Sequence, residues 1–171
     1  MSKSRLTAAY GMLTALALIL GYVESLVPVF FAVPGMKLGL SNLVVLVALY
    51  TLGEKGAVFI NLVRIVVSAL LFSGIGALIF SLSGGILSLI VMIFLKRTDA
   101  FGMRGVSVAG GVSHNTGQLI AAAFSVNTLY ITAYLPVLWI AGIVCGLVIG
   151  IVSAVITERM SPVIKRLFPG S

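Results

Sequence analysis

Long runs of apolar residues, separated by Gly, Pro and charged residues, are the feature that most constrains this chain of 171 residues. Six such runs occur, at 6–22, 38–52, 56–72, 76–95, 106–126 and 131–156. A helix needs about 20 apolar residues to cross the hydrocarbon core of a bilayer. Only 9% of the residues are charged, whereas soluble domains contain about 25%. The pattern predicts an all-α integral membrane protein with six transmembrane helices, forming a single domain over 1–171.

The second and sixth runs depart from the ordinary length. The run at 38–52 is short for a full crossing, so it begins earlier, tilts less, or is shielded by neighbouring helices. The sixth run is long, and its aromatic residues Tyr130, Tyr134 and Trp139 suit a start at the membrane interface. Pro136 fits a helix start near that point. The tail at 157–171 mixes basic and apolar residues, which predicts a short helix lying on the membrane surface.

The positions of the basic residues predict the orientation of the runs. With the N-terminus in the cytoplasm, nine of the 11 Lys and Arg residues lie inside, Lys37 lies outside, and Arg64 falls within a run. Cytoplasmic loops carry such an excess of positive charge. Both termini are therefore expected in the cytoplasm, and the net charge of +7 needs no nucleic acid partner. A cleaved signal peptide at the N-terminus is the alternative for the first run, but its removal would spoil this asymmetry.

The scarcity of reactive side chains excludes several kinds of chemistry. The chain has four acidic residues, one His and one Cys, too few for a disulfide framework or a cysteine-based metal cluster. It contains no phosphate-binding loop. Prenyl diphosphate chemistry usually requires clustered aspartates to hold Mg²⁺, and Asp99 is the only aspartate. We therefore predict no catalytic residue, no metal and no cofactor, and a chain that is not itself an enzyme.

Polar residues inside the runs are the candidates for function, because a charge within hydrocarbon is costly and usually functional. Asn61, Arg64 and Ser68 share one face of a helix at i, i+3 and i+7, and His114 and Gln118 share another. Similar depths in the membrane predict that these faces meet in one polar chamber. No acidic residue lies within a run, so a ligand anion, carbonyl or amide is expected to fill the donors of Arg64; a structural arginine is the alternative.

The predicted substrate-binding site extends from this chamber to an outer mouth. Packing is the alternative role for His114, and a proton relay through it is disfavoured because no carboxylate continues the path. A stripe of small residues in the first run, Thr7, Gly11 and Ala15, must face another helix, which can belong to a partner protein. The predicted substrate-binding residues are Lys37, Asn42, Asn61, Arg64, Ser81, His114, Asn115 and Gln118.

Particular strings resemble a known bacterial membrane family. They include Pro34-Gly-Met-Lys37-Leu-Gly-Leu, Ser81-Leu-Ser-Gly84-Gly85 and His114-Asn-Thr-Gly117-Gln118. The chain resembles the Gx transporters, also called heptaprenyl diphosphate synthase component I, over nearly its whole length. These are similar to the substrate-binding S components of energy-coupling-factor transporters, which are bundles of six helices. The resemblance implies a multi-pass protein of the bacterial cytoplasmic membrane, with the Thr7, Gly11 and Ala15 stripe docked on a transmembrane coupler.

Two hypotheses from different classes follow. In the first, the chain captures a small vitamin-like, anionic or amphipathic molecule, and a coupler with two ATPases supplies the energy for uptake. In the second, it is a non-catalytic membrane subunit of heptaprenyl diphosphate synthase in isoprenoid biosynthesis, and a soluble prenyl diphosphate synthase is its partner. Basic cytoplasmic loops around Lys96, Arg97 and Arg104 would then attract a diphosphate or an acidic partner. The lipid bilayer is a partner under both hypotheses.

Overall fold

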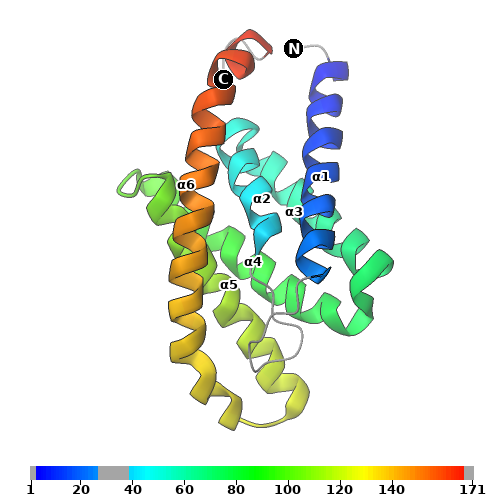
Figure 1. Cartoon of the computed structure of the whole chain (residues 1–171), viewed down its shortest axis with the longest axis vertical. Coiled ribbons are helices and arrows are strands. Elements are labelled where there is room, and N and C mark those ends of the chain that lie inside the picture. The colour runs from blue at the N-terminus through cyan, green and yellow to red at the C-terminus, as the bar shows by residue number, and fades with distance from the viewer. Residues whose placement is uncertain (1–2, 27–38, 168–171) are drawn as a thin grey trace.

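The computed structural model describes residues 3–26 and 39–167, and Figure 1 shows the whole chain. No strand occurs in these two ranges, which confirms the predicted all-α class. The order is α1 (Lys3–Leu26), α2 (Leu40–Thr51), α3 (Gly53–Ser68), a π-helical turn η1 (Ala69–Ser73), α4 (Gly74–Thr98), α5 (Met103–Val126), a 3₁₀ turn η2 (Tyr130–Tyr134) and α6 (Leu135–Leu167).

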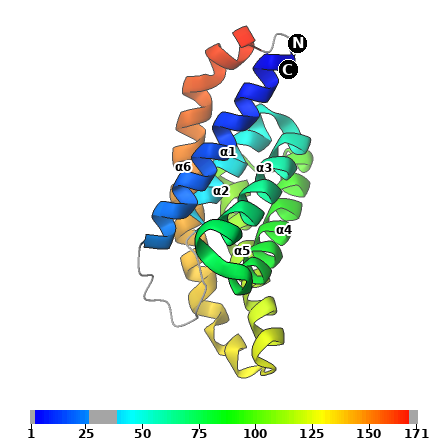
Figure 2. The same cartoon turned by 90° about the vertical axis from the view of Figure 1, so that its right-hand side faces the viewer.

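Successive helices run in alternating directions along the long axis of the molecule. The start of α1 and the end of α6 lie at the same end, at the top of Figures 1 and 2. The turn between α2 and α3 and the turn between α4 and α5 lie toward that end too. Residues Arg5, Lys55, Lys96, Arg97, Arg104 and Arg159 occupy the helix ends there. We call this the basic end of the bundle.

Three described helical segments are long and apolar enough to cross a membrane: Ser4–Leu26, Gly53–Thr98 and Tyr130–Met160. The second contains α3, η1 and α4 together. The helix α5 is not among them, because it carries Arg104, His114, Asn115 and Gln118. Of these, His114, Asn115 and Gln118 are buried, and α5 packs most extensively against α4 and α6. These features are those of a membrane-associated helical protein.

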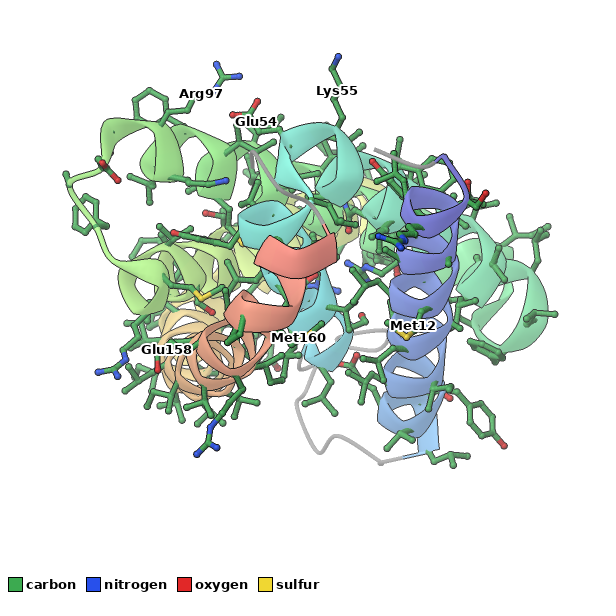
Figure 3. All side chains as sticks on the ribbon, turned by 90° about the horizontal axis from the view of Figure 1, so that it is seen from above. Met12, Glu54, Lys55, Arg97, Glu158 and Met160 are labelled. Carbon is green, nitrogen blue, oxygen red and sulfur yellow. The ribbon has the colours of Figure 1, made fainter. Side chains whose placement is uncertain are left out.

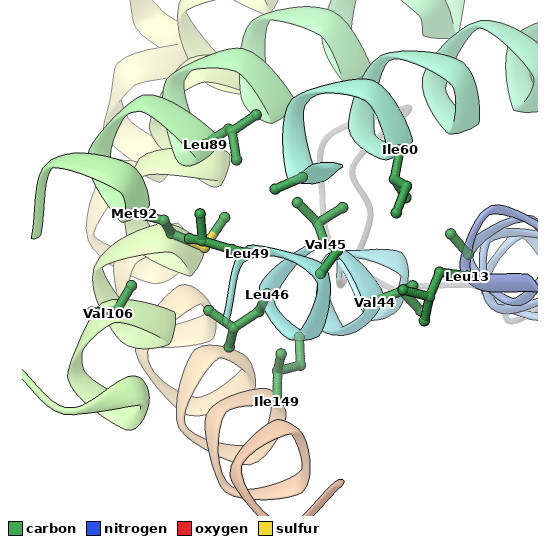
Figure 4. Packing of buried hydrophobic residues seen from close by; sticks show 13 residues of the cluster. Leu13, Val44, Val45, Leu46, Leu49, Ile60, Leu89, Met92, Val106 and Ile149 are labelled. Atoms are coloured by element: carbon green, nitrogen blue, oxygen red, sulfur yellow. The ribbon is translucent and has the colours of Figure 1, made fainter. Parts of the chain in front are cut away.

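The short helix α2 lies at the centre of the hydrophobic core. Its 12 residues are about 18 Å long at 1.5 Å per residue, which is less than the hydrocarbon thickness of about 30 Å. Val44, Val45, Leu46 and Leu49 are almost completely buried, and Figure 4 shows neighbouring helices on several sides of them. Shielding by neighbours, one of the explanations offered for this short run, is therefore the one that the structure shows.

Glycines bring α5 into direct backbone contact with α6. A Cβ atom added to Gly146 would lie 2.8 Å from the Ser107 carbonyl oxygen and 2.8 Å from Val108 Cα. A Cβ added to Gly142 would lie 3.0 Å from the Gly111 carbonyl oxygen. Small residues allow helices in lipid to approach this closely and gain van der Waals contact. The glycines of α5 and α6 thus serve packing.

The structure corrects two expected helix boundaries. The first run was expected to end at residue 22, but α1 continues to Leu26 because neither Gly nor Pro occurs at residues 23–26. The tail was expected as a separate surface helix, but α6 continues through it to Leu167, with Pro162 inside the helix. The expected helix start near Pro136 is confirmed, since α6 begins at Leu135.

One exposed ion pair, between Arg97 and Glu54 (Figure 3), and one partly buried lysine, Lys96, connect helices at the basic end. Arg97 Nε and Nη2 donate to the two carboxylate oxygens of Glu54 at 2.7 and 2.5 Å. Lys96 Nζ donates to the Leu49 carbonyl oxygen at 2.6 Å and lies over the Tyr50 ring. Partial burial lowers the pKa of Lys96, and the hydrogen bonds from Arg97 lower the pKa of Glu54. These contacts join α4 to α2 and α3.

The Glu54 pair predicts a small pH dependence of stability. Because the pKa of Glu54 is lower in the folded protein, its contribution is present near neutral pH and is lost as the pH falls through that lowered value. We expect Glu54→Gln to reduce the difference in thermal unfolding temperature between pH 7 and about pH 4. The exposed Glu158 is the matched control, and Glu158→Gln should leave that difference unchanged. An equal reduction in both variants would contradict a specific role for the pair.

Candidate functional site

Arg64, in the last third of α3, is buried and held by neutral side-chain oxygens. Its Nε and Nη2 donate to Asn61 Oδ1 at 3.1 and 2.7 Å. Nη2 also donates to Asn42 Oδ1 at 2.7 Å, and Nη1 donates to Ser41 Oγ at 2.6 Å. A guanidinium has five N–H donors, so these bonds use most of its capacity. These acceptors are neutral, so they do not offset the positive charge of Arg64.

Asn61 extends this network to α4. Its Nδ2 donates to the Gly85 carbonyl oxygen at 3.1 Å. A Cβ atom on Gly85 would lie 2.6 Å from Ile65 Cδ1, so glycine allows α3 and α4 to approach at this level. Arg64 and Asn61 together connect three helices, α2, α3 and α4. These bonds are those of a structural arginine, which was the alternative to a ligand-binding role for Arg64.

A small cavity lies beside Arg64 where five helices meet. Its volume is about 20 Å³, which is space for about one water molecule. Nearly all of its walls come from residues with polar side chains or from glycine. The residues that line it are Gly21, Glu24, Gly39, Ser41, Arg64, Ile65, Ser68, Ser81 and His114. We call it the Arg64 cavity.

Glu24 places a carboxylate in the same cavity, which corrects the expectation that Arg64 has no acidic residue near it. The side chain is 2% exposed, and its Oε1 accepts a hydrogen bond from the Gly39 backbone N–H. It interacts electrostatically with Arg64. The expectation was wrong because α1 is longer than the apolar run. Leu13, Ala17 and Gly21 are buried at regular helical spacing before Glu24, and continuing that spacing would have found it.

A second cavity lies on another side of His114. Its volume is also about 20 Å³, and residues of α2, α4, α5 and α6 line it. Its polar lining includes Ser88, Ser107, His114 and Cys145. Ser88 is 1% exposed, and its Oγ has no hydrogen-bond partner in the described part of the chain. We call it the Ser88 cavity. The polar faces therefore converge as expected, but two water-sized cavities take the place of one open chamber.

The other two predicted residues of α5, Asn115 and Gln118, are buried but do not line the Arg64 cavity. Asn115 borders the Ser88 cavity, and its Nδ2 donates to the Leu138 carbonyl oxygen at 2.8 Å, which connects α5 to α6. Gln118 is 3% exposed and packs against Gly84 of α4. Neither amide atom of Gln118 has a hydrogen-bond partner among the described residues. Asn115 thus links α5 to α6, whereas the Gln118 amide is available to a polar group.

The remaining predicted residues lie at separate places. Ser81 borders the Arg64 cavity, and Asn42 borders the Ser88 cavity while it binds Arg64. Lys37 lies outside the described residues. Thr7, Gly11 and Ala15 are exposed on α1, and a Cβ on Gly11 would meet no atom within 4 Å. This stripe therefore faces away from the bundle and not toward a helix of the same chain.

The described acidic residues do not assemble into a site for a metal ion. No group of three or more His, Cys, Asp or Glu residues that could hold a metal occurs in the described ranges. Glu54 is paired with Arg97 at the basic end, whereas Glu24 is buried in the Arg64 cavity. The site therefore offers hydrogen-bonding and charged groups, and no cluster of carboxylates.

Comparison with known proteins places the sequence in one family. The chain matches the family model described as heptaprenyl diphosphate synthase component I over residues 13–156. That range includes α2 to α5 and all the residues that line both cavities. No curated protein and no solved structure matches the chain. The chain belongs to the heptaprenyl diphosphate synthase component I family.

Proposed function

We propose that this chain is a non-catalytic membrane subunit that works with a soluble heptaprenyl diphosphate synthase. The family match over residues 13–156 is the observation that supports it. The chain has only four acidic residues, and they do not converge, so the partner must supply the carboxylates that hold Mg²⁺. The role of this chain is then to hold the catalytic subunit at the bilayer, where the growing apolar product can enter lipid.

The proposed orientation is six crossings of the bacterial cytoplasmic membrane with the basic end in the cytoplasm. The alternating helix directions and the residues Lys55, Arg97 and Arg104 at one end support this topology, because cytoplasmic loops are rich in Lys and Arg. A soluble synthase would meet the basic end. Its positive charge would attract an acidic partner surface or the diphosphate group of the substrate.

Affinity purification from the native membrane tests this proposal. We expect the tagged protein, extracted in mild detergent, to retain a soluble aspartate-rich prenyl diphosphate synthase that mass spectrometry identifies. The variant Arg104→Glu should lower the recovery of the synthase, because this substitution reverses one exposed charge at the basic end. Adding the chain in nanodiscs should also change the rate or product length of the synthase. No association together with unchanged synthase activity would contradict the proposal.

A second candidate is a substrate-binding subunit for uptake of a small vitamin-like, anionic or amphipathic molecule. The buried cluster around Arg64 favours it. A fixed guanidinium suits recognition of a polar ligand, and so does the Gln118 amide, which has no hydrogen-bond partner among the residues that the structure describes. Both cavities hold about one water, so such a ligand requires the helices to separate. The exposed Thr7, Gly11 and Ala15 stripe would contact a coupler. Recovery of a membrane coupler with two ATPases in the same purification would favour this candidate over the first.

A further inference from the structure

His114 lies between the two water-sized cavities and borders both of them. On one side, the Arg64 cavity contains the Glu24 carboxylate and the hydroxyl groups of Ser68 and Ser81. On the other side, the Ser88 cavity contains the hydroxyl groups of Ser88 and Ser107. An imidazole can accept a proton at one nitrogen while it donates from the other. His114 is therefore placed to connect the polar groups of both cavities.

Each cavity has the size and the polar lining that a buried water requires. About 20 Å³ accommodates about one water molecule, and a buried water usually makes about three hydrogen bonds to groups that otherwise lack partners. Ser88 Oγ is such a group in the described part of the chain. A water in the Ser88 cavity would satisfy Ser88 Oγ and extend the network from His114 into the bundle.

The charges around His114 are nearly balanced. Among the described residues that line the cavities, the titratable groups are Glu24 of α1, Arg64 of α3, His114 of α5 and Cys145 of α6. The α2 and α4 residues contribute amide and hydroxyl groups, which do not titrate. With Glu24 ionised, Arg64 charged and His114 neutral, the sum of these charges is zero. One additional proton makes it +1, and the Glu24 carboxylate is the group that stabilises an imidazolium nearby.

We propose that Glu24 and His114 form a proton-binding site inside the bundle, bridged by water in the Arg64 cavity and continued to Ser88 by water in the second cavity. The proton comes from bulk water, binds a nitrogen of His114, and is stabilised by the carboxylate of Glu24. The site would thereby change the charge that Arg64 and its surroundings present to a polar ligand or to a moving helix. This inference does not depend on which partner proteins the chain binds.

Nuclear magnetic resonance of histidine tests the site directly, because His114 is the only histidine in the sequence. The full chain, purified with a histidine-free tag and labelled with ¹⁵N-histidine, is placed in phosphatidylethanolamine and phosphatidylglycerol nanodiscs. We expect the imidazole nitrogen signals to titrate reversibly between about pH 5 and pH 8. We also expect magnetisation transfer from water to the imidazole.

Two variants separate the proposal from ordinary titration. Glu24→Gln keeps an oxygen that can accept the Gly39 N–H, and it should lower the midpoint of the His114 titration by about one pH unit. Glu158→Gln, which removes an exposed acid at the other end of the bundle, should leave the midpoint unchanged. The wild-type protein alone is enough to overturn the proposal. It would do so if its imidazole signal stayed constant from about pH 4 to pH 9, or if that signal received no magnetisation from water. So would an unchanged midpoint in folded Glu24→Gln.

Discussion

Replacing Gly111 by Ala is expected to destabilise the folded protein by about 3 kcal/mol, the upper part of the range for overpacking a closely fitted interior. An added Cβ would collide with the Gly142 carbonyl oxygen of α6. The obstacle is backbone, so no side chain can rotate away, and α5 must separate from α6 along much of their contact. The Ser88 cavity, which Gly111 and Gly142 both border, would be deformed by that separation.

Heating the protein in detergent and measuring the fraction that stays monodisperse gives the midpoint that checks this expectation. The matched control is Gly76→Ala in α4, because a Cβ there would meet no atom within 4 Å. Its helical backbone tolerates alanine, so its midpoint should equal or slightly exceed that of the wild type. A Gly111→Ala protein with the wild-type midpoint would show that α5 and α6 do not touch in this way.

The fold could be predicted from the apolar runs to a large extent, because in lipid a helix satisfies its own backbone hydrogen bonds. The length of 38–52 also indicated that α2 is unusual. Helix ends were harder, since no Gly or Pro follows residue 22 to stop α1. The continuation of α6 through Pro162 was also missed. A proline inside a helix removes only one backbone donor and does not always end the helix.

The candidate site could be predicted only in part. Asn61 and Arg64 are close in the sequence, so their shared face follows from helical periodicity, and they do interact. The carboxylate of Glu24 comes from a helix distant in sequence, and no local pattern reveals that α1 brings it to α3. Sequence spacing also cannot give the volume between helices. The polar faces were therefore correctly expected to meet, while the size of the space between them was not.

The role of Arg64 is where the structure changes an expectation most. From the sequence, a guanidinium without an acidic partner suggested a ligand that fills its donors. In that case Arg64→Ala would abolish ligand retention and leave folding intact. The four hydrogen bonds from Arg64 to Ser41, Asn42 and Asn61 indicate that this side chain also holds α2 against α3. A loss of ligand binding in this variant would therefore have two possible causes.

Arg64→Ala is expected to destabilise the folded protein by about 3 to 5 kcal/mol, the cost of removing one member of a buried charged network. The buried oxygens of Asn42 and Asn61 would lose their donor, and the Glu24 carboxylate would lose the cation near it. The same heating assay measures this loss. Arg104→Ala at the exposed basic end is the control and should change stability by less than about 0.5 kcal/mol. Arg64→Lys should fall between wild type and Arg64→Ala, because an ammonium keeps the charge but cannot reproduce the planar fork. If folded Arg64→Ala unfolds at the same temperature as the wild-type protein, the network is dispensable for stability, which would contradict the structural role of Arg64.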